Sequence, residues 1–330
     1  MSPQDSATAD TSIAVTTAGT AVTDASPDAG TGRGAAPDRT GAVKGPSRAG
    51  TLQAALGVIA FSLTFPATAW GLESFGPWSL VAARSVLAAV IAGGCLLALR
   101  VPVPAREHWA GLAVVAAGVV LGFPLLTTLA LQTSTTAHAA VVVGLLPLTT
   151  AFFSALRMSA RPSPTFWGAA VTGAAAVIAF TVQQSGGALT IADTYLFGAL
   201  LVCAAGYTEG GRLARIMPGW QVIGWALVLC LPLAVPGALV ALSYEPVHLT
   251  AHGVAGLLWV AAGSQFLGLI VWYRGMAAIG IPKASQLQLA QPLLTLVWSV
   301  LLLGEHLTPA VPLTASAVLV CIAVTQRARS

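Results

Sequence analysis

Ten long apolar segments run from residue 51 to the end of the chain, and they decide what the chain can fold into. They lie near residues 51–70, 78–99, 109–131, 136–156, 166–183, 194–213, 219–243, 253–273, 282–303 and 308–325. About 20 helical residues, each rising about 1.5 Å, cross the hydrocarbon core of a bilayer. A helix also satisfies its own backbone polar groups, as lipid requires. The segments therefore predict an all-α polytopic membrane protein with ten transmembrane helices.

The composition agrees with this interpretation and excludes a soluble domain. Charged residues make up only 8% of the chain, whereas hydrophobic residues make up 56%. A soluble domain carries about 25% charged residues, so this chain has too few charges to cover a surface that faces water. The four cysteines lie inside apolar segments and form no CxxC pair. The sequence therefore predicts neither a disulfide framework nor a metal site, and no cofactor is expected.

Residues 1–50 differ from the rest of the chain. They contain no aromatic residue and are rich in Ala, Thr, Gly, Pro, Ser and Asp. Such a segment buries too little surface to offset the entropy of the chain, so it is predicted to be a disordered tail. It also lacks the apolar core of a secretory signal.

The positions of the charges predict the orientation of the helices. With the N-terminus in the cytoplasm, every lysine and arginine except Arg84 falls in the tail or at an inner helix end, while the outer connections carry acids: Glu73, Asp193, Glu245 and Glu305. This pattern follows the positive-inside rule and predicts that both termini are cytoplasmic. It also explains the net charge of +4 without a nucleic-acid partner. The excess of arginine over lysine and the many alanines and glycines favour a bacterial source, and hence the plasma (inner) membrane.

An internal repeat relates the two halves of the chain. The stretches 110–118 and 255–263 share seven of nine residues at an offset of 145, and the same offset aligns 147–156 with 292–301. The offset spans five predicted helices, an odd number, so the two copies are expected to insert in opposite orientations. The predicted halves are residues 51–183 and 194–325. Inverted repeats of this kind are typical of secondary transporters, whose substrate site lies between the repeats.

The ninth apolar segment carries a more specific signal. A mid-helix Pro292 is followed by Leu302-Leu303-Gly304-Glu305-His306-Leu307-Thr308. Together with the repeat, this ending resembles the EamA-type permeases of the drug/metabolite transporter superfamily. The resemblance implies ten helices in two inverted repeats of five and transport, most often export, of a small metabolite such as an amino acid or an amphipathic compound. The first half departs from the pattern, because Ser154-Ala155-Leu156-Arg157-Met158 follows Pro147 without a Gly-Glu pair.

Charged residues inside the predicted helices are the first candidates for a site. Arg84 lies in the second helix, where a charge costs about 2.5–3.5 kcal/mol on insertion scales. It is interpreted as a contact for an anion, or else as a structural residue that reaches the interface or a backbone carbonyl. Glu209 lies in the sixth helix near Tyr207, and both are placed in the candidate site. Glu209 is a candidate for proton exchange or substrate binding, with an i,i+3 pair to Arg212 as the alternative.

The ninth helix carries three polar side chains on one face. Gln288, Gln291 and Thr295 follow i, i+3, i+7 spacing, and Pro292 frees the carbonyl of Gln288 from its helical bond. The pattern favours a polar substrate site, and helix-to-helix hydrogen bonding is the alternative. Pro147 repeats the arrangement in the fourth helix, near Thr150.

The first and eighth helices add two weaker candidates. In the first helix Pro66 frees the carbonyl of Ser62, which nearby hydroxyls such as that of Thr64 can satisfy. The eighth helix offers Gln265. The predicted substrate-binding set is therefore Thr64, Arg84, Thr150, Tyr207, Glu209, Gln265, Gln288, Gln291 and Thr295.

These features favour a secondary transporter that works by alternating access. Its expected partners are a small-molecule substrate and the lipid bilayer, and protons are a candidate coupling ion. A channel-like facilitator or a non-transporting membrane receptor is the alternative. An enzyme is not expected, because the histidines lie near helix ends and Asp193 is the only aspartate outside the tail.

Overall fold

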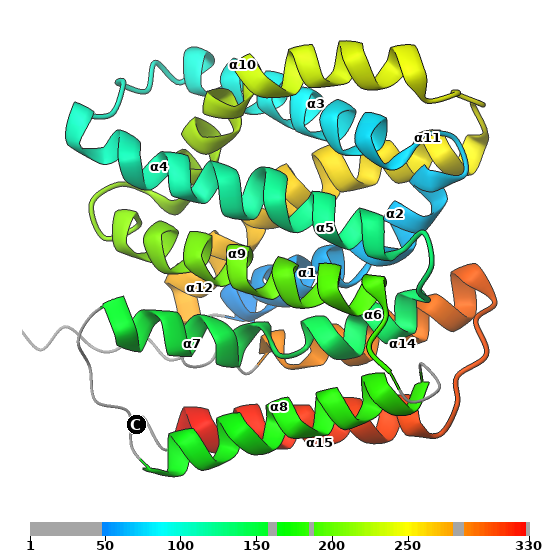
Figure 1. Cartoon of the computed structure of the whole chain (residues 1–330). Coiled ribbons are helices and arrows are strands. Elements are labelled where there is room, and N and C mark those ends of the chain that lie inside the picture. The colour runs from blue at the N-terminus through cyan, green and yellow to red at the C-terminus, as the bar shows by residue number, and fades with distance from the viewer. Residues whose placement is uncertain (1–47, 158–163, 185–187, 280–286, 328–330) are drawn as a thin grey trace, which may run out of the picture. The chain divides into compact units, whose positions relative to one another are not determined.

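The fold is built from helices alone in the part of the chain that the structure describes (Figure 1). The computed structural model describes residues 48–157, 164–184, 188–279 and 287–327. The predicted all-α class is confirmed. The predicted tail lies outside these residues except for its last three, which are helical because α1 begins at Arg48. All described residues belong to one compact unit.

The helices follow the ten predicted segments closely, but several segments are divided. The first half contains α1 (Arg48–Ser62), α2 (Thr64–Leu72), α3 (Pro77–Ala98), η1 (Arg106–His108), α4 (Trp109–Val115), η2 (Ala116–Gly122), α5 (Phe123–Ala130), α6 (Thr136–Val143), α7 (Leu146–Arg157) and α8 (Pro164–Gln184). The second half contains α9 (Ile191–Leu213), α10 (Gly219–Tyr244), α11 (Ala251–Leu258), η3 (Trp259–Gly268), α12 (Leu269–Ile279), α14 (Ala290–Leu303) and α15 (Ala310–Arg327).

The lengths and surfaces of these helices suit a bilayer. Six continuous helical stretches among the described residues are long and apolar enough to cross a membrane, and shorter apolar helices occupy the other four predicted segments. Large aliphatic side chains point outward, as with Leu233 and Leu239 on α10, each 68% exposed. Water disfavours such a surface and lipid solvates it, so the chain is a multi-pass membrane protein.

Two wide π-helical turns occur at matching positions of the two halves. η2 covers residues 116–122, and a shift of 145 carries these to 261–267, inside η3. A π turn closes i→i+5 hydrogen bonds and often occurs at functional sites. Apolar patterning did not predict these turns, because a π turn leaves the hydropathy of the segment unchanged.

The packing of the helices follows the repeat. The 145-residue shift converts the contact of α9 with η2 into that of α1 with η3, and the contact of α9 with α5 into that of α1 with α12. It likewise converts α7 against α9 into α14 against α1. Such an exchange is expected of two halves that share one fold. We call the contacts between residues 48–184 and 188–327 the seam.

The helices α3 and α10, which correspond under the shift, run antiparallel across the seam. Glu245 follows the end of α10, and its carboxylate accepts backbone N–H bonds from Trp78 (3.2 Å) and Ser79 (2.7 Å) at the start of α3. At the opposite ends of the same two helices, Gly224 packs against Leu96. The connections α5–α6 and α10–α11 lie together on the right of Figure 1, and α3–α4 and α9–α10 lie on the left. We call the right-hand end, which carries Glu245, the acidic end, and the other the arginine end.

Two large apolar clusters form most of the core, and a third, small one joins α1 to α12. One large cluster gathers buried side chains of α6, α8, α9, α14 and α15, and the other gathers those of α3, α4, η2 and α10. Both large clusters contain residues from each half, so the core itself joins the halves across the seam.

Candidate functional site

A polar contact forms where the first helix is broken by proline. Pro66 has no N–H to donate to the carbonyl of Ser62, and the helix breaks between α1 and α2. Thr295 on α14 donates its hydroxyl to that carbonyl at 2.9 Å. Trp298, one turn further along α14, donates its indole N–H to the Ser62 hydroxyl at 2.9 Å. The hydroxyl that satisfies the freed carbonyl therefore comes from the other half of the chain.

A second buried contact joins two of the predicted site residues. Arg84 on α3 is 5% exposed, and its Nε donates to the Gln265 side-chain oxygen at 3.0 Å. A guanidinium nitrogen of Arg84 also lies 3.4 Å from the carbonyl oxygen of Val260. Gln265 is 8% exposed, and its Nε2 has no hydrogen-bond partner among the described residues. The two residues are 181 positions apart in sequence, and only the tertiary fold brings them together.

The wide turn η3 also places Ser264 in contact with the first half. Ser264 precedes Gln265 in this turn, and its hydroxyl lies 2.6 Å from that of Thr64 on α2. Ser264 is buried and Thr64 is half-buried. The structure thus gathers buried or half-buried polar side chains of α2, α3 and α14 in contacts that cross the seam.

Thr150 occupies the position in α7 that corresponds to Thr295 in α14. Its hydroxyl is buried and has no hydrogen-bond partner among the described residues, whereas the hydroxyl of Thr295 has two acceptors, the carbonyls of Ser62 and Gln291. The two halves therefore differ at this matched pair. An unpaired hydroxyl in this position is available to a ligand or to water.

The predicted polar face of the ninth segment is only partly buried. Thr295 is 2% exposed, but Gln288 and Gln291 are half-buried. Pro292 is predicted to free the carbonyl of Gln288, which the structure describes. The preceding residues 280–286 lie outside the described part of the chain. The use of the two amides as substrate contacts stays a prediction.

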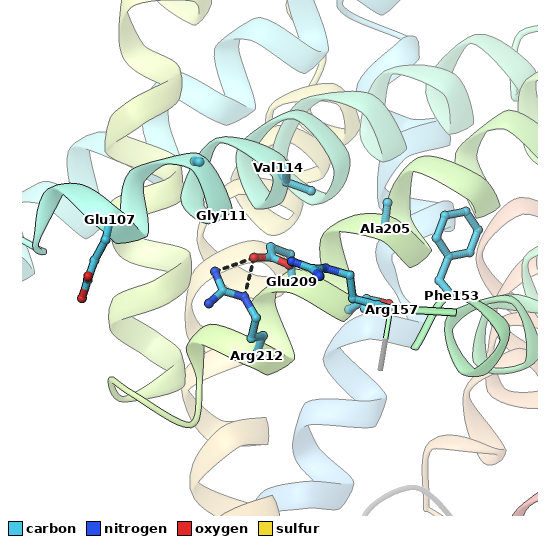
Figure 2. Close-up of a pocket in the computed structure, with 10 residues that line it drawn as sticks. Glu107, Gly111, Val114, Phe153, Arg157, Ala205, Glu209 and Arg212 are labelled. Atoms are coloured by element: carbon cyan, nitrogen blue, oxygen red, sulfur yellow. Dashed lines mark hydrogen bonds and ion pairs between the residues drawn. The ribbon is translucent and has the colours of Figure 1, made fainter. Parts of the chain in front are cut away.

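A pocket opens at the arginine end, and Figure 2 shows its lining. Its volume is about 440 Å³. It is lined by residues of η1, α4, α7 and α9: Glu107, Ala110, Gly111, Val114, Phe153, Arg157, Ala205, Thr208, Glu209 and Arg212. Most of the wall is apolar, and charged groups of both signs line the remainder.

Glu209 is held in this pocket by two arginines. It forms an ion pair with Arg212, three residues further along α9, and Arg157 of α7 lies 3.9 Å from its other carboxylate oxygen. The i,i+3 alternative for Glu209 thus matches the geometry, and the second arginine ties α7 to α9. Tyr207 is 39% exposed and is not among the lining residues, so the structure separates it from Glu209.

At the acidic end, carboxylates bridge helices. Glu305 follows α14, and its carboxylate accepts from the backbone N–H groups of Thr136 (2.7 Å) and Ala137 (2.9 Å) at the start of α6. An Asp or Glu at a helix N-terminus satisfies donors that have no helical partner. With the matching contact of Glu245 on α3, both carboxylates lie just beyond helices of the second half and cap helices of the first.

Asp193 corrects one expectation from the sequence. It was placed in an outer connection, but it lies in the first turn of α9 and is fully buried. One carboxylate oxygen lies 2.7 Å from Nε2 of His138, and the other accepts from the N–H and hydroxyl of Thr190, both at 2.8 Å. Thr190 and Asp193 form a capping box, which the Thr-x-x-Asp spacing reveals in the sequence. The partner His138 had no such signal.

The pocket residues Arg157, Glu107 and Phe153 were also not predicted. Arg157 was counted only as a charge at an inner helix end, and Glu107 and Phe153 were not considered. No motif marks them, because the pocket is defined by how α4, α7 and α9 pack. Among the described residues no group of three His, Cys, Asp or Glu side chains gathers as a metal site.

We expect Thr295→Val to lower the free energy of unfolding by about 1–2 kcal/mol. The substitution keeps the shape of the side chain but leaves the Ser62 carbonyl without its donor. Thermal unfolding of the purified protein in detergent measures the effect. Thr172→Val is the matched control, because Thr172 is exposed and bonds only within its own helix. Equal losses in the two variants would contradict a specific role for the contact across the seam.

Comparisons with known proteins agree with the fold and the repeat. The family model for the EamA-like transporter family matches twice, at residues 48–182 and 190–326. An uncharacterised transporter of Bacillus subtilis (strain 168), YdeK, is 42% identical over 281 residues, which cover 84% of this chain and 97% of that protein. An uncharacterised transporter of Haemophilus influenzae is 28% identical over 119 residues, 34% of this chain and 70% of that protein.

A solved crystal structure has the same fold. It covers 84% of this chain and 97% of its own chain, with a TM-score of 0.59 and 21% sequence identity. The two family matches confirm that the chain is a duplicated unit, and they confirm the resemblance drawn from the ninth segment. The chain belongs to the EamA-like transporter family.

Proposed function

We propose that this protein is a secondary transporter that exports a small metabolite across the bacterial inner membrane by alternating access. The observation that carries this proposal is the set of buried polar contacts at the seam. Arg84 with Gln265, Thr64 with Ser264, and Thr295 with Ser62 each join a helix of one half to a helix of the other. Polar groups at the interface of two repeats are what a carrier uses to bind a solute at the midplane.

The proposal includes ten spans arranged as two inverted repeats of five. The antiparallel course of α3 and α10 supports it, as does the cap that Glu305 places on α6. The shift relates α3 to α10, whereas Glu305 joins the end of α14, the counterpart of α7, to the start of α6, which precedes α7 in the same predicted segment. With the positive-inside rule, the arginine end faces the cytoplasm and both termini lie there. Accessibility of cysteines placed near each terminus, tested from both sides of the membrane, checks this topology.

The two ends of the molecule differ in the way that alternating access requires. At the acidic end, Glu245 and Glu305 bridge helices through backbone N–H bonds. At the arginine end a pocket of about 440 Å³ lies between α4, α7 and α9. The caps at one end and the pocket at the other support the proposal of a carrier entered from the arginine end.

Flux into proteoliposomes that contain only this protein tests the proposal. Labelled L-amino acids and amphipathic dyes, each with and without a pH gradient, are the probes. We expect saturable uptake of at least one solute class. Unsaturable conductance in single-channel recordings would favour the channel alternative, and absence of flux for every probe would count against transport.

The Glu209→Gln variant tests the pocket in the same vesicles. We expect flux to fall by about tenfold, the effect of about 1.4 kcal/mol on the barrier. The neutral amide weakens the tie between α7 and α9 that Arg157 forms with Glu209. Glu73→Gln is the control, since its side chain is 45% exposed at the acidic end and meets His252 only at 3.6 Å. Unchanged flux in Glu209→Gln would remove this carboxylate from the transport cycle.

A further inference from the structure

Arg84 differs from every other arginine whose side chain the structure describes. The described arginines at residues 48, 100, 106, 157, 212, 215 and 274 are exposed, whereas Arg84 is 5% exposed. Its burial places a permanent positive charge inside a membrane-spanning helix. Such a charge is expensive to bury and requires compensation from its surroundings.

The compensation that Arg84 receives is incomplete. Its described hydrogen-bond acceptors are two neutral oxygens, the Gln265 side-chain oxygen at 3.0 Å and the Val260 carbonyl at 3.4 Å. No carboxylate among the described residues lies within ion-pair distance of it. Neutral acceptors orient a guanidinium but do not balance its charge. The described residues around Arg84 therefore supply no negative charge to balance it.

Gln265 adds donors to the same place. Its oxygen accepts from Arg84, so the amide cannot be turned around without setting its NH₂ group against the guanidinium donors. This fixes the Nε2 group as the free end of the side chain. Nε2 is buried, the residue is more than nine-tenths buried, and the nitrogen has no partner. A buried amide that lacks an acceptor is costly, so a group that supplies one is favoured there.

The arrangement belongs to one half only, although the two halves share a fold. The 145-residue shift pairs Arg84 with Leu229 and Gln265 with Val120. Both wide turns exist, yet only η3 carries polar side chains at these positions. A polar pair that served only to stabilise the repeated fold would be expected in both halves. The polar pair is thus an addition to the fold.

We propose that Arg84 and Gln265 bind the carboxylate, or a comparable oxyanion, of the transported solute. The guanidinium supplies the positive charge and further N–H donors, and Nε2 of Gln265 supplies a donor beside it. Two neighbouring donors match the two oxygens of a carboxylate. The inference rests on the proposed transport function and narrows it to anionic or zwitterionic solutes.

Thermal unfolding of the purified full-length protein tests binding directly. The probes are matched pairs: each proteinogenic L-amino acid with its C-terminal amide, and each of several 2-hydroxy acids with its amide. Phosphate monoesters with their parent alcohols form a second arm, which separates carboxylates from other oxyanions. We expect at least one acid to raise the Tm of the wild type while its partner without the oxyanion, the amide or alcohol, does not. Stabilisation by these partners as well, or by no acid at all, would overturn the inference.

The Gln265→Glu variant separates binding from packing. It keeps the shape of the side chain and places a carboxylate beside Arg84, so the charge is balanced internally and the fold is preserved. We expect the affinity for the acid to fall by about 10- to 100-fold, as the loss of charge-assisted hydrogen bonds implies. Arg84→Lys should recover part of the binding that Arg84→Gln loses. Arg274→Gln removes an exposed arginine and should leave the affinity unchanged.

The result distinguishes this inference from the transport function on which it rests. If Gln265→Glu binds the acid as tightly as the wild type does, Arg84 and Gln265 serve only to hold α3 against η3, and the inference is wrong. Saturable flux of neutral or cationic solutes alone in proteoliposomes would likewise overturn it while leaving the carrier intact. Absence of flux for every solute would contradict both the binding inference and the proposed transport function.

Discussion

Replacing Asp193 with alanine should lower the free energy of unfolding by about 3 kcal/mol, because it removes a buried carboxylate that accepts several hydrogen bonds. Asp193 is fully buried and contacts the ring of His138 at 2.7 Å, and it closes the capping box at the start of α9. The substitution leaves the His138 nitrogen and the Thr190 N–H without acceptors. We expect a Tm lower by many degrees in detergent, and poor recovery of folded protein from membranes.

Two controls isolate the cause. Glu73→Ala removes a half-exposed acid that lies 3.6 Å from His252, and pairs of that kind contribute about 0–1 kcal/mol. A double-mutant cycle with His138→Gln measures the coupling between Asp193 and the imidazole. If the two single effects simply add, the stability comes from the cap and not from the pair. A Tm of Asp193→Ala equal to that of Glu73→Ala would contradict the buried placement altogether.

The second large effect is expected at Gly118, in the wide turn η2. A Cβ built on Gly118 would lie 2.3 Å from the backbone carbonyl oxygen of Val202 on α9. That oxygen cannot rotate away as a side chain does, so α9 and η2 must separate. We expect Gly118→Ala to lower the free energy of unfolding by about 3 kcal/mol, the upper part of the usual range for overpacking. Thermal unfolding measures it.

The matched control, Gly94→Ala, is expected to change the free energy of unfolding in the opposite direction. Gly94 is exposed in α3, and a Cβ there would meet nothing within 4 Å. Alanine costs a helix less backbone entropy than glycine, so Gly94→Ala should stabilise by about 0.5–1 kcal/mol. If both variants lost stability equally, the effect would not arise from the contact between η2 and α9.

Much of the fold could be predicted from the sequence because bilayer thickness limits the lengths of apolar segments. The described helices occupy all ten predicted segments, and the repeat is confirmed as a duplicated family unit. The breaks within segments could not be predicted. The break of the first helix at Leu63 depends on Pro66 and on the hydroxyl that Thr295 of α14 donates to the Ser62 carbonyl. The wide turns leave the hydropathy of their segments unchanged.

The candidate site was only partly foreseen, and the reason lies in sequence separation. Arg84 and Gln265 were chosen separately, as polar groups in lipid-spanning segments, and their contact across 181 positions emerges only in three dimensions. Asp193 was misplaced because an acid near a helix start looks the same in a loop and in a capping box until its partner is known. The predicted roles of Glu209, Gln288 and Gln291 as substrate contacts stay predictions.

The caps at the acidic end have a consequence for how such a carrier rests when empty. Under the 145-residue shift, Glu245 corresponds to Arg100 and Glu305 to Ala160, so neither carboxylate has a counterpart in the first half. Four backbone N–H groups are capped on one side of the molecule, and hydrogen bonds to a charged group contribute about 1.5–3 kcal/mol each. In the proposed transport cycle these four bonds must break before the acidic end can open. If the proposed alternating access operates, we expect the empty protein to rest with the acidic end capped and solute binding to supply the free energy that breaks these caps.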